Sequence, residues 1–344
     1  MAEKGMWRKI VRIAAFMMAV AVIVAYICYA SHLAQEHRST QKIEKVVISL
    51  PDSTSTQRFT STAQIRKYLE QSGLKLEKEL VDSVDAVAIS KHIAKKGFVR
   101  DVDVYTTYAG ELYIDIMQHK PVMRLLCGGI NTYVTSEGDV FPSPVGSAFY
   151  TAVVTGEYKP LMPRNYEGKA ADYVISLVDG VDAEIKTIKS EMSALRRERT
   201  RCVERIAELK GSDTSELKAH VAELNTKEAT LKQRQATLEE RKKKLLKKSE
   251  DFANLTNFVT EVGDDEFWSA EVVQYVADTT YMGEISLRLI PRSGNFVIEF
   301  GTLNNSEKKL EKLRNFYDKG LSHMGWNRYK KVDIRYDKQI ICTE

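Results

Sequence analysis

Few side chains in this 344-residue sequence have the types and spacing that catalysis requires. Ser72 and Lys75 match the pattern SxxK, in which a lysine can activate a serine nucleophile. The pattern is common by chance, however, and this one falls where a predicted helix ends at Gly73. The chain contains no phosphate-binding loop and no GxGxxG, HExxH or GxSxG motif, and its six histidines are scattered. The sequence therefore predicts a protein that is not an enzyme and has no metal or cofactor.

The cysteines do not form a disulfide framework. Cys28 lies in an apolar segment, which leaves Cys127, Cys202 and Cys342, an odd number in a chain of this length. Cys127 and Cys342 both lie in strand-like sequence. They could pair if their strands are neighbours, and the sequence leaves this open.

The last strands can bind another protein through hydrogen bonds of their main chain. Val332–Tyr336 and Gln339–Thr343 are predicted to be the last two strands, and the chain ends directly after them. A terminal strand commonly lies at the edge of a sheet, where its unpaired N–H and C=O groups can accept a strand from another protein. We therefore expect the carboxyl-terminal strands to bind a partner chain.

An apolar segment near the amino terminus anchors the chain. Residues 13–30 contain no charged side chain, and as a helix they span about 27 Å, close to the ~30 Å of the bilayer interior. The segment is longer than the apolar region of a cleaved signal peptide. Basic residues before it predict a cytoplasmic tail at residues 1–12, a membrane span at 13–30 and a linker at 31–41, with all later residues outside the cytoplasm. The net charge of +4 does not suggest nucleic-acid binding.

Two globular regions are predicted after the linker. Residues 42–120 contain a strand, two helices and a hairpin of two strands, in that order. The first helix has a capping box at Ser61 and Gln64. Residues 121–180 and 251–344 are rich in strands and form a second, mixed or antiparallel domain, which also contains a short helix at Phe252–Val262. The fold class is therefore α+β.

A helical hairpin is predicted to interrupt this second domain at residues 181–250. Apolar positions alternate at spacings of three and four residues on both sides of a break at Gly211–Thr214, which predicts an antiparallel coiled coil. The segment carries 18 Lys and Arg residues against 13 Asp and Glu residues. It is either a basic arm for an acidic surface or an ordinary solvated coiled coil.

The order of these parts and six stretches of sequence resemble the bacterial cell-division family FtsQ, also called DivIB, and in particular its Bacteroides-type members. The stretches are residues 119–126 (HKPVMRLL), 133–142 (YVTSEGDVFP), 265–276 (DEFWSAEVVQYV), 283–301 (GEISLRLIPRSGNFVIEFG), 313–336 (LRNFYDKGLSHMGWNRYKKVDIRY) and 339–343 (QIICT).

The resemblance implies a POTRA-like domain at residues 42–120 and a non-enzymatic scaffold of the division septum. It implies an inner-membrane protein with a cytoplasmic amino terminus and a periplasmic bulk. In this family the last strands bind FtsB, itself complexed with FtsL, by strand addition. The matching edge is Val332, Asp333, Ile334, Arg335 and Tyr336.

Two features depart from the family pattern. A glycine-containing turn and a late tryptophan are replaced here by Asp337-Lys338 and Cys342-Thr343-Glu344. The hairpin is an addition to the typical family pattern, and we expect it to contact a further division or envelope component. The alternative function is a periplasmic adaptor of an export pump, although the hairpin lacks the flanking lipoyl-like halves of such adaptors. A membrane-anchored hydrolase is a weaker alternative.

Overall fold

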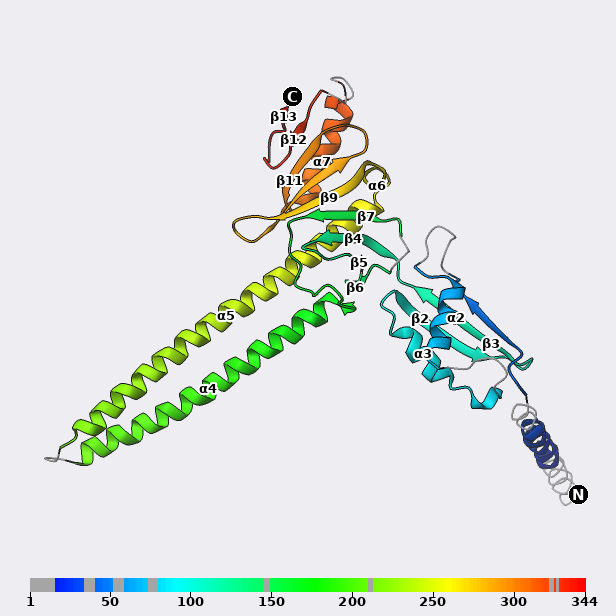
Figure 1. Cartoon of the computed structure of the whole chain (residues 1–344), viewed down its shortest axis with the longest axis horizontal. Helices are drawn as coiled ribbons and strands as arrows, with labels where there is room; N and C mark the ends of the chain where they lie inside the picture. Colours follow the sequence, from blue (N-terminus) through cyan, green and yellow to red (C-terminus); the bar gives the residue numbers. More distant parts are fainter. Residues whose placement is uncertain are drawn as a thin grey trace, which may run out of the picture. The chain divides into compact units, whose positions relative to one another are not determined.

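The computed structural model describes residues 16–33, 41–51, 59–73, 80–144, 149–209, 213–321, 325 and 328–344 (Figure 1). The chain divides into two compact units. The first comprises Met1–His119 with Gly146–Phe149, and the second comprises Lys120–Val145 with Tyr150–Glu344.

The apolar segment forms a helix at Phe16–Leu33 that is long and apolar enough to cross a membrane. Its side chains are exposed to the surroundings, as those of a lipid-facing helix would be. The helix continues three residues beyond the predicted end of the span at residue 30, because Ser31, His32 and Leu33 contain no helix breaker. The predicted tail at residues 1–12 and linker residues 34–40 lie outside the described residues.

The first unit has the predicted β-α-α-β-β order. Its elements are β1 (Lys45–Ser49), α2 (Thr62–Gln71), a 3-10 turn (Val81–Ser83), α3 (Ala86–Ala94), β2 (Val99–Thr106) and β3 (Glu111–Gln118). The strands are ordered β1-β3-β2, with β1 parallel and β2 antiparallel to β3.

Local capping positions both helices of this unit. The predicted capping box is confirmed, since the Gln64 amide donates to Ser61 Oγ over 3.2 Å and the Ser61 amide donates to Gln64 Oε1 over 2.9 Å. Asp85 Oδ1 accepts the Ala88 amide over 2.9 Å at the start of α3. Apolar side chains from α2, α3 and the sheet then form a separate core that includes Leu69, Ile93 and Ile114.

The described residues of the second unit form a sheet of ten strands. Its order is β13-β12-β11-β10-β9-β7-β4-β5-β6-β8. The bounds are β4 (Pro121–Cys127), β5 (Thr132–Thr135), β6 (Asp139–Pro142), β7 (Ala152–Gly156), β8 (Gly168–Lys169), β9 (Val272–Thr279), β10 (Ile285–Pro291), β11 (Val297–Thr302), β12 (Lys331–Asp333) and β13 (Ile341–Thr343). Parallel pairing of β7 with β9 joins the two sequence regions that the hairpin separates.

The helical hairpin consists of α4 (Ala170–Glu208) and α5 (Ser215–Asp264), which lie side by side in Figure 1. Both helices extend beyond the predicted limits of 181 and 250. The prediction of a separate helix at Phe252–Val262 is wrong, because no glycine or proline interrupts α5 before it. Five of its side chains instead belong to the core of the second unit: Phe252, Leu255, Phe258, Val259 and Val262.

Apolar seams hold the two arms of the hairpin together. Ile185, Ile188 and Met192 of α4 are buried with Leu238 of α5, as the three-four spacing predicts. A buried carboxylate interrupts this seam, since Glu228 accepts from Arg196 and Arg199 over 2.8 Å each. These pairs join α4 to α5 in an antiparallel arrangement.

Ion pairs also occupy part of the basic cluster at residues 241–248. Lys242 pairs with Asp182 over 2.6 Å, Lys244 with Glu240 over 2.9 Å, and Lys247 with Glu284 over 3.4 Å. These three cations are therefore neutralised within the molecule, which favours the interpretation of this segment as a solvated helical arm.

Two shorter helices complete the second unit. These are α6 (Glu266–Glu271) and α7 (Ser306–Phe316), and a π-helical turn at Tyr317–Leu321 follows α7. Leu313 of α7 is buried with Phe258 of α5 and Phe300 of β11, and the rings of Phe258 and Phe300 lie 4.9 Å apart. The inner end of α5 and helix α7 thus share one core with the ten-stranded sheet.

The four cysteines are free, which excludes a Cys127–Cys342 disulfide in this structure. Cys127 lies on β4 and Cys342 on β13, and five strands separate them in the sheet. Disulfide geometry requires Cα atoms within about 7 Å, so strands this far apart cannot be bridged.

Candidate partner-binding edge of the sheet

The predicted binding segment Val332–Tyr336 is only partly a strand, and it is not the edge of the sheet. Strand β12 ends at Asp333 and pairs on both sides, in parallel with β11 and antiparallel with β13. The side chains of Val332 and Ile334 are fully buried in the core. The edge is instead β13, which pairs with β12 and has no second neighbour among the described strands.

Strand alternation indicates which groups of β13 remain open. Ile334 donates its amide to the Glu299 carbonyl of β11 over 3.1 Å, so residue 332, two positions earlier in the strand, also directs its main-chain groups to β11. Residues 331 and 333 consequently face β13. Cys342 lies opposite Val332, and its own N–H and C=O therefore point away from β12, toward the open side.

A bidentate ion pair stabilises the turn after β12. Arg335 Nη2 and Nε lie 2.6 and 2.9 Å from the carboxylate oxygens of Asp333, and the Arg335 amide donates to the same group over 3.1 Å. Asp333 is 7 % exposed, and the Arg335 guanidinium holds the pKa of this carboxyl below its usual value. The pair fixes the direction in which the chain leaves the sheet.

Helix α7 holds the same turn from the other side. Lys312 Nζ donates to the Ile334 carbonyl over 2.8 Å and also to the Tyr336 carbonyl. Burial lowers the pKa of Lys312. Tyr336 lies in the segment that leads from β12 to β13, and its side chain is 46 % exposed. Arg328 and Glu344 form a further ion pair of 2.7 Å in this region.

The five predicted residues therefore have three different positions. Val332 and Ile334 pack in the core, Asp333 and Arg335 pair with each other, and Tyr336 alone offers a large exposed apolar side chain. The prediction omitted the residues of the edge, Ile341–Thr343, although they belong to the last predicted strand. The strand-like sequence of Gln339–Thr343 was the signal that could have identified them.

The SxxK pattern does not form a nucleophile in the described structure. Ser72 caps the end of α2, and its hydroxyl donates to the Leu69 carbonyl over 2.6 Å. Lys75 lies outside the described residues. Within the part of the chain that is described, no three His, Cys, Asp or Glu side chains cluster as metal ligands do.

Comparison with known families identifies two parts of the chain. Residues 41–117 match a family model of the POTRA-like domain. Residues 212–343 match the model "FtsQ/DivIB, C-terminal related". This second match begins before α5, so the second arm of the hairpin lies within it, contrary to the expectation that the whole hairpin is an addition to the family. No curated protein matches the chain significantly.

Along the chain, the apolar helix comes first, the POTRA-like match second and the FtsQ/DivIB-related match last. FtsQ/DivIB is a family of non-enzymatic division proteins. The chain is therefore an FtsQ/DivIB-type protein with a POTRA-like domain and a family-related carboxyl-terminal domain.

Proposed function

We propose that this chain is a single-pass membrane scaffold of the division machinery that binds an FtsB/FtsL-type partner by strand addition to β13. The family assignment supports a scaffold role in cell division. The observation that carries the strand-addition step is the position of β13, which pairs with β12 and leaves its other side open among the described strands. A partner strand would pair with the main-chain groups of Cys342.

The proposed interface combines this edge with the side chain of Tyr336. Main-chain pairing supplies affinity with little sequence preference, whereas an exposed aromatic side chain at the border supplies a specific contact. The ion pair of Asp333 with Arg335 and the hydrogen bonds from Lys312 hold the turn between β12 and β13 in place before the partner arrives. Such preorganisation reduces the entropy that binding costs.

Orientation in the membrane is part of the proposal. The basic residues Lys4, Arg8, Lys9 and Arg12 precede the apolar helix, and such a flank normally remains in the cytoplasm. Both globular units then lie in the periplasm, and the protein is enriched at the division septum.

The test is co-purification of a tagged full-length chain with a small single-span partner that has a coiled coil. Cys342→Pro removes the N–H that faces the open side, so we expect at least a tenfold loss of captured partner. Cys342→Ala is the matched control, because it alters the same side chain but keeps the N–H, and it should retain binding. Circular dichroism would establish that both variants remain folded.

Equal capture by the proline and alanine variants would refute strand addition at β13. Capture of an outer-membrane channel in place of a division protein would instead favour the export-pump adaptor.

A further inference from the structure

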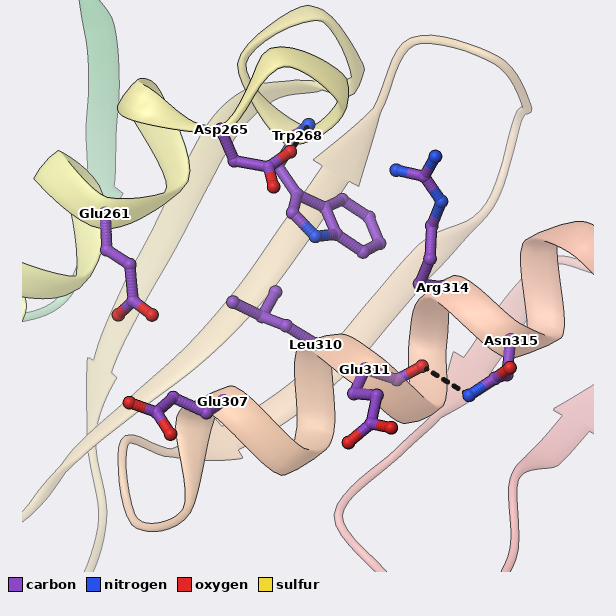
Figure 2. A pocket seen from close by; sticks show the side chains of 8 residues that line it. All are labelled: Glu261, Asp265, Trp268, Glu307, Leu310, Glu311, Arg314 and Asn315. Carbon is purple, nitrogen blue, oxygen red and sulfur yellow. Dashed lines mark hydrogen bonds between the residues drawn. The ribbon is translucent and has the colours of Figure 1, made fainter.

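A second surface on the same unit lies between the end of α5, α6 and α7. There the chain forms a depression of about 440 Å³ whose lining includes Trp268 and Leu310 (Figure 2). None of the residues that line this surface belongs to β13, and Tyr336 is not among them.

Two acidic rows border the depression. Glu261 and Asp265 are four residues apart at the end of α5, and Glu307 and Glu311 are four residues apart on α7. Side chains at this spacing lie one helical turn apart on the same face. Figure 2 shows the two rows on opposite sides of the depression, with Leu310 between them.

Local structure accounts for only part of this charge. Asp265 caps α6, because it accepts the amides of Phe267 and Trp268 over 2.9 and 2.8 Å. Glu307 lies in the first turn of α7, where the helix dipole favours an acid. Glu261 and Glu311 have neither role. None of these four carboxylates has an ion-pair partner among the described residues.

The one cation in the lining is already engaged elsewhere. The guanidinium of Arg314 lies 3.6 Å from the centre of the Phe267 ring, and its Nε lies 3.6 Å from the Asp318 carboxylate. The lining of the depression therefore has four carboxylates and one guanidinium, and none of the four carboxylates forms an ion pair with that guanidinium in the described structure.

The lining of the depression also includes a hydrogen-bond donor, the indole N–H of Trp268, which belongs to neither acidic row. Trp268 is only 5 % exposed, and its indole N–H has no acceptor among the described residues. Figure 2 shows the indole nitrogen on the ring edge that faces Leu310. A largely buried indole normally donates to an acceptor, so this donor is available to a ligand that enters the depression.

We propose that this depression docks a basic segment of a partner protein. Lysine or arginine side chains one helical turn apart would pair with both acidic rows. Their aliphatic stems would cover Leu310, and a carbonyl of the segment would accept from the Trp268 indole. The charge, spacing and open donor all favour a cationic polypeptide as the occupant.

The test uses the purified full-length chain and a short fluorescent helical peptide with arginines at i and i+4 around a leucine. Fluorescence anisotropy should detect binding that weakens as the ionic strength rises. Glu307→Gln with Glu311→Gln should reduce the affinity about fivefold to tenfold, the sum expected for two exposed ion pairs. Trp268→Phe should reduce it about threefold or more, because the donor is lost while the ring remains.

A matched pair of substitutions controls for total charge. Asp179→Asn with Glu204→Gln removes the same charge from exposed positions of α4 and should leave the affinity unchanged within about twofold. Equal losses in the two double variants would overturn the proposal. So would equal binding of a peptide with glutamine in place of arginine, or no binding of the arginine peptide. These outcomes are separable from strand addition, because partner capture through β13 should persist in the Glu307/Glu311 variant.

Discussion

Gly156 is the last residue of β7 and lies against the backbone of Ala277 in β9. Its φ is +113°, and a Cβ added there would lie 2.2 Å from the carbonyl oxygen of Ala277. The obstacle is backbone, which cannot rotate away as a side chain can. The pairing of β7 with β9, which joins the two sequence regions of the sheet, ends one residue before Gly156, so a side chain at this position would push the two strands apart.

We predict that Gly156→Ala lowers the free energy of unfolding by at least about 3 kcal/mol, because backbone strain and a steric clash add together. Gly283→Ala is the matched control. Gly283 also has a positive φ, of +83°, but its Cβ would meet nothing within 4 Å, so only the strain of about 1 kcal/mol should appear. Urea denaturation of both variants measures the difference. Equal losses would show that β9 can move away.

A second residue-scale prediction concerns pH. The pKa of Asp333 is lowered in the folded state by Arg335, so the pair stabilises the protein above the unfolded pKa of about 3.9. This stability is lost as the pH falls from about 4 through the lower folded pKa. We expect Asp333→Asn to cost about 2 kcal/mol at neutral pH.

Below pH 4 the Asp333→Asn variant and the unsubstituted protein should converge in stability, because protonation removes the same charge. Thermal unfolding at a series of pH values measures this convergence. A stability difference that stays constant as the pH falls would mean that Arg335 does not stabilise the ionised carboxylate.

At the scale of elements, the hairpin has an outer part and an inner part. Along the outer part, α4 and α5 bury side chains mainly against each other, as Ile188 and Leu238 do. The inner end of α5 contributes Phe252, Leu255 and Phe258 to the core of the sheet. The projecting arm is therefore only the outer part of the hairpin. The inner part of the two helices belongs to the domain that contains the sheet.

We predict that replacing residues 181–250 by a flexible Gly/Ser linker leaves the second unit folded with a cooperative unfolding transition. A longer excision of residues 170–264 should abolish that transition. It removes Ala170 and the five large core side chains of α5, and each of these five is worth about 2–5 kcal/mol in a domain with about 5–15 kcal/mol in total. Calorimetry of both excised chains provides the measurement. Loss of folding after the shorter excision would show that the arm is integral to the domain.

At the scale of the whole molecule, one apolar helix and the FtsQ/DivIB assignment are consistent with a single-pass membrane division protein. The helix Phe16–Leu33 spans about 27 Å, close to the thickness of the bilayer interior. A fluorescent protein fused to the amino terminus would then remain in the cytoplasm.

We predict that this fusion forms a band at midcell in dividing cells. The same fusion with residues 41–344 removed keeps the anchor but lacks both globular units, and it should give an even rim. An even rim from the full-length fusion would contradict the proposed role at the septum.

The sequence by itself predicted the local elements of this protein. The alternation of Glu111–His119, the capping box at Ser61 and the three-four spacing from Ile185 to Leu245 each depend on neighbours within one or two turns. The helices and strands that these patterns predict depend little on where distant parts of the chain lie. The family resemblance rested instead on the order of the parts and on six stretches of sequence, and the two family matches support it.

Only the tertiary structure decided which strand is the edge and which side chains of the candidate site are exposed. Val332 and Tyr336 lie four residues apart in one predicted strand, yet one is fully buried and the other is 46 % exposed. The difference arises because Val332 lies on the core face of β12, whereas β12 ends at Asp333 and the chain has turned away before Tyr336. Strand pairing depends on residues that are distant in sequence, so a local pattern identifies a strand without identifying its neighbours.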